Sequence, residues 1–388
     1  MAERSYFDWN ATAPLRPEAL ERFREALGTC GNPSSVHAEG RAARRLIERA
    51  REEVAALVAA RAADVFFTSS GTEANMLALS PAIETAAEKR PRGRLLISAI
   101  EHSSVRSGGR FSPNAVEEIA VEPDGRVSLA ALAAAVTTSA RPLVSLMLAN
   151  NETGVIQPVA EAAAIVHAAG GLLHVDAIQA VGRVACDIGA LGADLLTLSA
   201  HKIGGPKGVG ALVRAREDIH LADPVIRGGG QERGLRAGTE NVAGIAAFGA
   251  AATAARSFGA AEAARMLALR ELLESGLRTI SPQAVIFGAG ASRLPNTTLF
   301  AAEGIKAETA VIAFDLEGVA VSSGAACSSG KVQPSHVLAA MGVLPSLQRG
   351  AVRLSLGWTT TEADLERCFG AWRKLATALS KEQRGMAA

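Results

Sequence analysis

The strongest constraint on the fold is an alternation of short apolar runs with Ala-rich amphipathic segments between about residue 40 and residue 260. This alternation is typical of strands joined by crossover helices in a mostly parallel sheet. It predicts a large α/β domain over residues 15–259. The expected strands are 65–68, 94–99, 116–121, 143–149, 172–176, 195–199 and 210–213, and the expected helices are 41–60, 73–87, 128–135, 158–169 and 241–257.

The pattern changes after a helical run at 261–279. Isolated strands and helices follow, with strands expected at 285–287, 296–300 and 352–356 and helices at 306–315, 334–341 and 362–379. This texture predicts a smaller α+β domain, made of residues 1–14 and 260–388. A chain of 388 residues is long enough to bury two such cores.

Charge and hydropathy exclude several classes of function. The 40 Lys and Arg residues nearly balance the 39 Asp and Glu residues, so we expect no nucleic acid or anionic membrane as a partner. Charges interrupt the apolar stretches well before the roughly 18 to 20 residues that a membrane span needs. The N-terminal sequence MAERSYFDWN offers no basic and then apolar signal region. We therefore expect a cytoplasmic protein.

The cysteines and histidines show no metal-binding pattern. Cys30, Cys186, Cys327 and Cys368 are scattered without a CxxC pair, which argues against a disulfide framework and a structural zinc site. The seven histidines lack HxxxH-type spacing. We therefore predict no metal.

One motif, FTSSGTEAN, has the features of an anion site. Gly71 and Thr72 open a helix directly after a strand, where backbone N–H groups and the helix dipole favour a phosphate. The alternative is an ordinary Ser or Thr cap with Glu73 in the first turn.

Two other polar groups follow apolar strands. Asp176 ends the strand at 172–176, and a carboxylate there is costly unless it meets a cation such as a pyridinium N–H, although it also suits an N-cap. Lys202 follows the strand at 195–199, beside Ser199 and His201. A half-buried lysine near other cations has a lowered pKa and can form a Schiff base, whereas a solvated loop lysine would not.

A phosphate-binding turn, a strand-end Asp and a strand-end Lys together suit pyridoxal 5′-phosphate. In open α/β sheets, ligands bind at the carboxyl ends of the strands, where all three are expected. His102 is placed to stack on the cofactor ring, and Asn151 and Gln179 are placed to hydrogen-bond its hydroxyl.

The chain resembles the NifS/IscS-type cysteine desulfurases from about residue 6 to residue 365. That resemblance implies a fold-type I, pyridoxal-phosphate-dependent homodimer with a seven-stranded sheet. Such an enzyme takes sulfur from L-cysteine, releases L-alanine and leaves a persulfide on one of its own cysteines. The motifs that carry the resemblance are YFDWNATAP, GNPSSVHAEGR, FTSSGTEAN, EHSSV, ANNETGVIQP, HVDAIQAVG, SAHKIGGPKGVG, GGGQERGLRAGTEN and SSGAACSSG.

The resemblance also implies a role for each matching residue. Lys202 would be the Schiff-base lysine, Asp176 the partner of the pyridine nitrogen, and His102 the residue stacked on the ring and a helper in proton transfer. Thr239 would reach the phosphate from the other subunit, so that the site is shared across a homodimer. The remaining cofactor-binding residues would be Gly71, Thr72, Ser199 and His201 at the phosphate and Asn151 and Gln179 at the ring hydroxyl.

Cys327 resembles the nucleophile that forms the persulfide. Its surroundings, SSGAACSSG, are all small residues, which suits a loop that swings between the cofactor and an external acceptor. Arg353 resembles the arginine that grips the substrate carboxylate, because a planar guanidinium pairs bidentately with a carboxylate. Asn32 is a second candidate for that carboxylate.

Several alternatives stay open at this point. A selenocysteine lyase or a pyridoxal-phosphate aminotransferase would use the same pocket, and a non-catalytic sulfur-transfer scaffold would keep the fold without the chemistry. The resemblance implies a sulfur-acceptor protein, such as an iron–sulfur scaffold, but does not identify it. It also leaves open a transient iron–sulfur cluster ligated by Cys327.

Overall fold

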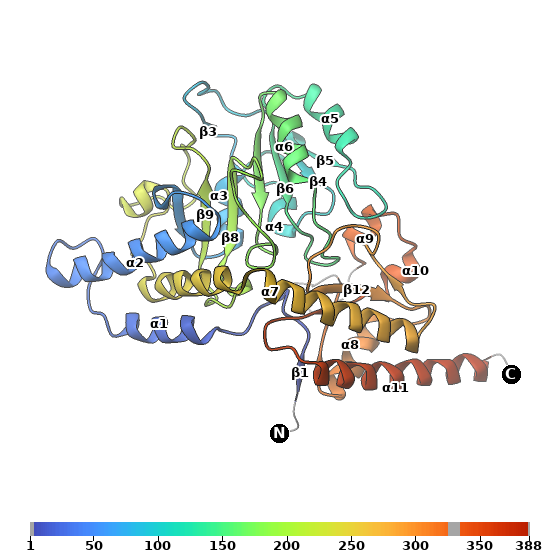
Figure 1. The fold of residues 1–388 in the computed structure, drawn as a ribbon. Coiled ribbons are helices and arrows are strands. Elements are labelled where there is room, and N and C mark those ends of the chain that lie inside the picture. The colour runs from blue at the N-terminus through green and yellow to red at the C-terminus, as the bar shows by residue number, and fades with distance from the viewer. Residues whose placement is uncertain (1–3, 325–333, 387–388) are drawn as a thin grey trace.

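A seven-stranded sheet lies at the centre of the larger half of the molecule (Figure 1). In this computed structural model, residues 4–324 and 334–386 are described. The strand order is β2-β9-β8-β7-β6-β4-β5, and only β9 runs antiparallel to its neighbours. The predicted α/β class and the seven predicted strands are confirmed. Their bounds are β2 Val65–Thr68, β4 Leu95–Ser98, β5 Val116–Ile119, β6 Leu143–Met147, β7 Leu172–Asp176, β8 Leu195–Ser199 and β9 Gly210–Arg214.

The central strands are mostly apolar because helices cover both faces of the sheet. Adjacent residues enter different cores: Leu195 packs on one face and Leu196 on the other. Helices α2 and α7 cover the second face together with α5 and α6, while α3 and α4 lie on the first. The bounds are α1 Pro17–Leu27, α2 Ala38–Leu57, α3 Gly71–Ala78, α4 Ser103–Arg106, α5 Leu129–Thr137, α6 Val159–Ala168 and α7 Val242–Ile280.

Three expected helical segments differ in the structure. The helix expected at 73–87 ends at Ala78, because Pro81 lacks a backbone N–H and disfavours a helical residue before it. The chain then forms β3 (Ile83–Glu84), which pairs with β10 (His220–Leu221). The helices expected at 241–257 and 261–279 are a single 39-residue helix, α7.

A four-stranded antiparallel sheet organises the smaller half, in the order β11-β12-β15-β14. The N-terminal strand β1 pairs with β13, so the chain begins in this half. In its core the Phe300 and Trp372 rings lie 4.9 Å apart in an edge arrangement. The bounds are β1 Ser5–Tyr6, β11 Val285–Ile286, β12 Thr297–Ala301, β13 Val319–Ala320, β14 Ser322–Ser323, β15 Val352–Ser355, α8 Ala307–Leu316, α9 His336–Ala340, α10 Pro345–Gln348 and α11 Glu362–Met386.

Helix α7 connects the two halves: in Figure 1 it runs below the large sheet and continues into the smaller half, where α11 lies below it. Phe248, near its start, packs in the core of the large sheet, whereas Leu269 and Leu273 pack in the small core. The predicted division at residue 259 falls inside this helix and stays a prediction. Because the helix is continuous, its backbone hydrogen bonds couple the placement of one core to that of the other.

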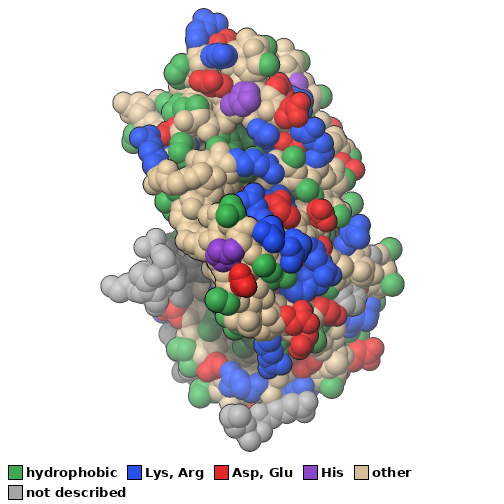
Figure 2. Space-filling model, turned by 90° about the vertical axis from the view of Figure 1, so that its left-hand side faces the viewer, with side chains coloured by type: hydrophobic (Ala, Val, Ile, Leu, Met, Phe, Trp, Pro, Cys, Tyr) green, Lys and Arg blue, Asp and Glu red, His purple; other side chains and the backbone are tan. Residues whose placement is uncertain are grey.

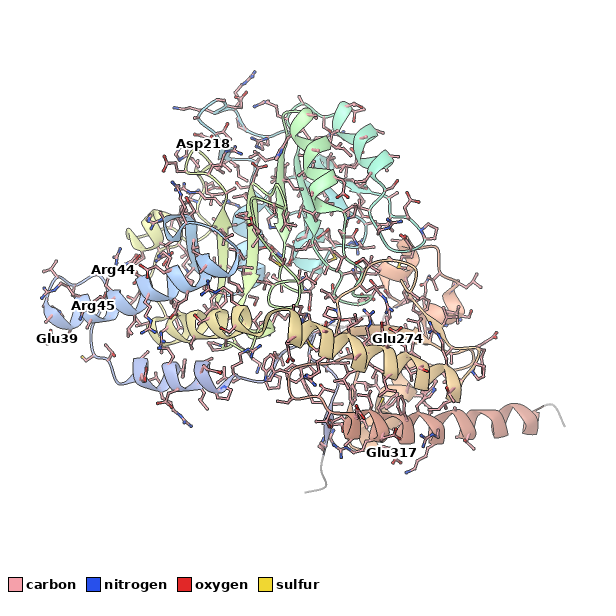
Figure 3. The ribbon with its side chains drawn as sticks, viewed as in Figure 1. Glu39, Arg44, Arg45, Asp218, Glu274 and Glu317 are labelled. Carbon is pink, nitrogen blue, oxygen red and sulfur yellow. The ribbon has the colours of Figure 1, made fainter. Side chains whose placement is uncertain are left out.

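Charges of both signs are interspersed on the surface, as the face in Figure 2 shows. Arg44 and Glu48 of α2 form one such pair, 3.3 Å apart, and Arg44 is labelled in Figure 3. No helix within the described ranges is both long enough and apolar enough to cross a membrane.

Candidate active site

A cavity of about 510 Å³ lies at the carboxyl ends of β7 and β8. Its walls come from the N-terminal segment, the start of α3, the start of α4 and the turn after β8. Of the predicted cofactor-binding residues, all except Thr239 line it. They are Gly71, Thr72, His102, Asn151, Asp176, Gln179, Ser199, His201 and Lys202.

Lys202 lies in a 3₁₀ turn (Ala200–Lys202) that follows β8 directly. Its Nζ donates hydrogen bonds to the carbonyl oxygens of Asn10, at 2.5 Å, and Ala11, at 2.9 Å. Burial is the main cause that lowers the pKa of Lys202 to about 7. The nearby charges of Arg353 and Arg183 also lower this pKa, and the opposing carboxylates raise it by less. A substantial fraction of the amine is therefore neutral near pH 7, the form that attacks a carbonyl carbon.

Asp176 ends β7 with its side chain buried and on the cavity wall. Its Oδ1 accepts a hydrogen bond from the backbone N–H of Ile178 at 3.0 Å, and its Oδ2 accepts one from Asn75 Nδ2 at 2.9 Å. These two donors fix the orientation of the carboxylate at the end of the strand. The cavity thus has an anion in one wall and a lysine in another.

Two imidazoles lie around the cavity, His102 and His201. Burial and the charge of Lys202 lower the pKa of His102, and its Nδ1 accepts a hydrogen bond from the backbone N–H of Ser104 at 3.2 Å. Burial, with smaller contributions from Lys202 and Lys207, lowers the pKa of His201 to about 4. Both rings are therefore neutral at pH 7.

The turn before α3 is built to receive an anion. Ser70 caps the helix: its Oγ accepts from the N–H of Glu73 at 3.1 Å, and its carbonyl accepts from Ala74 at 3.0 Å. The earlier N–H groups, of Gly71 and Thr72, have no partner within the helix and lie at the positive end of its dipole. Gly210 of β9 lets the sheet approach this turn, because a Cβ there would lie 2.4 Å from the Ser70 carbonyl carbon.

Gln179 also lines the cavity, but its amide already has protein partners. Its Nε2 donates to the Asn10 carbonyl at 2.9 Å, and its Oε1 accepts from Arg183 at 2.6 Å. The same Asn10 carbonyl accepts from Lys202. The N-terminal segment therefore ties the lysine turn to the segment after β7.

Three of the predicted site residues that the structure describes are not on the cavity wall. The Arg353 side chain is 2% exposed, and its guanidinium donates to Asp8 Oδ1 at 2.7 Å and to the Asn151 carbonyl at 2.9 Å. Thr239 and Asn32 are exposed residues away from the cavity lining. Cys327 lies outside the described residues.

The sequence reasoning missed residues that tertiary structure brings to the cavity. The cavity is also lined by Ala11, Thr12, Ser104 and Lys207. Asn75 is not on the wall but donates a hydrogen bond to Asp176. The segment containing Ala11 and Thr12 lies about 190 positions before Lys202 in the chain, so no local pattern links them. The motif containing Asn75 was noted for its phosphate turn, but a polar residue in the following helix carries no local signal of its own.

The three cysteines in the described part of the chain divide into two kinds. Cys186 and Cys368 are buried, and burial raises the pKa of both thiols to about 12, which suppresses the reactive thiolate. Cys30 is exposed in the segment between α1 and α2. Within residues 4–324 and 334–386, no group of three His, Cys, Asp or Glu side chains is arranged to hold a metal ion.

Comparison with known proteins gives consistent matches over nearly the whole chain. The family model of aminotransferase class-V matches residues 5–368. A cysteine desulfurase of Cereibacter sphaeroides is 43% identical over 371 residues, covering 94% of each protein. Cysteine desulfurase IscS of Anaeromyxobacter sp. is 41% identical, covering 93% of this chain and 89% of that protein. The structure of a NifS-like protein from Rickettsia africae superposes with a TM-score of 0.86 at 36% identity, covering 96% of this chain and 99% of the other.

The fold and the cavity, together with these matches, define the class. The chain belongs to the aminotransferase class-V family and is an enzyme. Within that family it belongs with the cysteine desulfurases of the NifS and IscS type.

Proposed function

We propose that this protein is a pyridoxal-phosphate-dependent cysteine desulfurase that moves the sulfur of L-cysteine onto Cys327. The observation that carries the proposal is that the same cavity is lined by Lys202, whose pKa is about 7, and by the buried carboxylate of Asp176. A catalytic amine that is neutral at working pH and a fixed anion at a strand end are the two protein groups this cofactor needs most.

The residues present fit pyridoxal 5′-phosphate. The N–H groups of Gly71 and Thr72 and the hydroxyl of Ser199 would hold the phosphate, and the Asp176 carboxylate would pair with the ring nitrogen. His102 would lie against the ring, and Asn151 would take its hydroxyl. The Gln179 amide contacts Asn10 and Arg183, so we assign it to holding the walls together as well as to the ring.

Bound pyridoxal phosphate supplies an electron sink that stabilises the charge left when the Cα–H bond of the substrate breaks. Lys202 holds the cofactor before substrate binds and afterwards carries the proton released from Cα. Asp176, whose carboxylate oxygens are held in place by two N–H donors, would pair with the ring nitrogen and favour positive charge there. His102, neutral at pH 7, is available to assist the proton transfers in the cavity.

The sulfur transfer itself belongs to Cys327. Its thiolate attacks the sulfur of L-cysteine, forming an S–S bond while the substrate S–Cβ bond breaks. The electron pair of the broken bond stays with the three-carbon fragment, which takes up protons and leaves as L-alanine. The persulfide on Cys327 is then passed to an acceptor protein, such as an iron–sulfur scaffold.

The substrate carboxylate is assigned to Arg353 and, secondarily, to Asn32. Arg353 contacts Asp8 and the Asn151 carbonyl in the described structure, so binding substrate would require part of its guanidinium to exchange partners. A solved structure named SspA in complex with cysteine, 26% identical with a TM-score of 0.76, gives a protein of this fold that binds the amino acid. The cytoplasmic location stays a prediction from the sequence.

A first experiment follows the sulfur. After turnover of L-cysteine, mass spectrometry of digested protein is expected to find one added sulfur on the peptide that contains Cys327. The Cys327→Ser variant is expected to lose sulfur transfer, whereas Cys30→Ser, the matched change at an exposed thiol, keeps it. Added sulfur on a Cys30 peptide, or full transfer by Cys327→Ser, would contradict the proposal.

The choice among substrates needs its own measurement. With L-cysteine and L-selenocysteine at equal concentration, we expect the alanine formed to come mainly from L-cysteine. Predominant selenium release would make the protein a selenocysteine lyase. Transfer of the amino group to a keto acid would make it an aminotransferase, and failure to bind pyridoxal phosphate would leave only the scaffold.

The shared site across a homodimer is tested by mixing two defective chains. A Lys202→Ala chain and a Thr239→Ala chain form mixed dimers in which one site keeps Lys202 from one subunit and Thr239 from the other. We therefore expect activity to return on mixing. If Thr239 acts within its own chain, no mixed site is complete and no activity returns.

A further inference from the structure

A chain of buried hydrogen bonds runs behind the cavity from β6 to α4. It passes through Ser145, His174, Thr197 and Asn75 and then divides at the Asn75 amide, with one N–H directed to Asp176 and the other to Ser104. All of these side chains except Ser104, which is 7% exposed, and Asp176, at 5%, are completely buried. Five of the members lie on three strands and one helix of the large sheet domain.

The direction of each hydrogen bond follows from counting donors, beginning at the carboxylate. Asp176 only accepts, so the NH₂ group of Asn75 must face it, at 2.9 Å. The Asn75 oxygen then faces Thr197 and accepts from its hydroxyl at 2.6 Å. Reversing the amide would place its oxygen against the carboxylate, which two acceptors do not tolerate.

The same count continues into the core. Since the single proton of Thr197 goes to Asn75, the Thr197 oxygen accepts from His174 Nε2 at 3.1 Å. Burial lowers the pKa of His174 to about 3, so its ring is neutral and its Nδ1 accepts from Ser145 Oγ at 2.8 Å. Every bond in this part of the chain therefore points toward Asn75.

On the other branch the count reaches the cavity. Ser104 Oγ accepts the second N–H of Asn75 at 2.9 Å and is left with its own proton to donate to His102 Nδ1 at 2.8 Å. The backbone N–H of Ser104 points to the same nitrogen at 3.2 Å. His102 Nδ1 is thus an acceptor, and the ring proton is on Nε2.

We infer that Asn75 is a positioning residue that sets two features of the site at once, the orientation of the Asp176 carboxylate and the Nε2–H tautomer of His102. One amide group holds both because its two N–H bonds diverge toward them. The inference concerns the protein alone, while its consequence for catalysis rests on the proposed function.

The energetic consequence is that cofactor binding is coupled to the buried hydrogen bonds of Asn75 and Thr197. A hydrogen bond to a charged group contributes more than one between neutral groups, and a buried acceptor left without its donor retains its full desolvation penalty. Removing the Asn75 amide is therefore expected to weaken cofactor binding roughly tenfold or more, because the Asp176 oxygen loses its side-chain donor. Removing the Thr197 hydroxyl frees the amide to turn and has a smaller effect in the same direction.

The test uses three variants that break the chain at successive points, Asn75→Leu, Thr197→Val and Ser104→Ala. The matched control is Thr298→Val, since Thr298 is also completely buried and donates to a carboxylate, Glu274 Oε1, at 2.9 Å in the small core. Figure 3 labels Glu274 on α7, in the half of the molecule away from the cavity. Both Thr→Val changes remove one buried hydroxyl, so their difference isolates the role of the chain.

The first readout needs no cofactor. In protein labelled with ¹⁵N-histidine, the two ring nitrogens of His102, assigned with a His102→Gln variant, are expected to report Nε2–H in the unaltered protein. Asn75→Leu and Ser104→Ala are expected to raise the population of Nδ1–H, by an amount that the backbone N–H of Ser104 limits because it still donates to Nδ1, and Thr298→Val is expected to leave the tautomer unchanged. An Nδ1–H ring in the unaltered protein, or one unmoved by Asn75→Leu, overturns the inference.

The second readout is the dissociation constant of pyridoxal phosphate, measured by equilibrium dialysis. We expect it to rise most in Asn75→Leu, less in Thr197→Val, and not at all in Thr298→Val. Equal effects of the two Thr→Val changes overturn the link between the chain and Asp176. If the unaltered protein does not bind the cofactor, the proposed function fails while the tautomer measurement still decides the inference. If Asn75→Leu does not fold, as judged by circular dichroism, Ser104→Ala decides the tautomer and Thr197→Val the coupling.

Discussion

Lys202 and Arg293 are buried cations in the two halves of the molecule, and their surroundings differ. Arg293 in the small core donates to both carboxylate oxygens of Glu274, at 2.8 and 3.0 Å, and Glu274 also accepts from Thr298. Among the described residues, Lys202 hydrogen-bonds to uncharged carbonyl oxygens. Burial and the charges of Arg353 and Arg183 lower its pKa, against smaller opposing effects of Asp8 and Asp176. The small core neutralises its charge where it is buried, while the cavity keeps a cation that readily gives up its proton.

The contrast separates structural burial from functional burial. A paired ion contributes to stability only as long as both partners remain, because either one alone is an uncompensated buried charge. An unpaired lysine costs stability and gains a reactive neutral amine. Three substitutions and one pH dependence test this contrast, taken from the largest expected effect to the smallest.

Lys202→Ala is expected to lower the rate of cysteine turnover at least about a thousandfold, because it removes both the cofactor-holding amine and the proton carrier. Its thermal stability is expected to stay the same or rise, since a desolvated cation is removed. Alanine formation and thermal unfolding measure the two effects. A variant that lost stability but kept activity would reverse the assignment of Lys202.

Arg293→Leu is expected to do the opposite. It leaves the buried Glu274 with the longer contact to Arg270 Nε, at 3.8 Å, in place of its two short bonds to Arg293, so we expect the free energy of unfolding to fall by up to about 3–5 kcal/mol. Turnover per folded molecule is expected to stay unchanged. Denaturant unfolding and the activity of the folded fraction give both quantities, and a specific loss of activity would mean that the small core takes part in the chemistry.

The lowered pKa of Lys202 predicts a pH dependence for loading the cofactor-free protein. Burial favours the neutral amine, so the reactive fraction is small below about pH 7 and complete well above it. The rate at which pyridoxal phosphate is captured, followed by visible absorbance, is expected to rise about tenfold per pH unit below that value and then to level. A rate that kept rising to about pH 10 would indicate an ordinary exposed lysine.

The smallest effect is expected at an exposed ion pair on α2. Arg44 and Glu48 are both well exposed, so we expect Arg44→Ala to change the free energy of unfolding by no more than about 0.5 kcal/mol. Denaturant unfolding provides the value, and a loss comparable to that of Arg293→Leu would remove burial as the explanation for the contrast.

Features of the site that depend on neighbouring residues could be predicted from the sequence, whereas features that depend on distant segments could not. Asp176 and Lys202 stood out in the sequence because each follows a run of apolar residues that can only be a buried strand, and the structure places both on the cavity wall. Asn10, whose carbonyl contacts Lys202 and Gln179, carried no signal, since a backbone oxygen has no identity in a sequence. Pro81 is a local indication that the helix before it ends early, and in the structure that helix ends at Ala78.

The sequence by itself determined the seven strands, their α/β class and the polar residues at the strand ends, because buried strands require apolar runs and parallel strands share one carboxyl edge. Only the tertiary structure decided which N-terminal carbonyls receive Lys202, which carboxylate neutralises Arg293 and which amide holds Asp176 and His102. These are contacts between segments far apart in the chain, and their energies depend on distance and burial, which the order of residues does not specify.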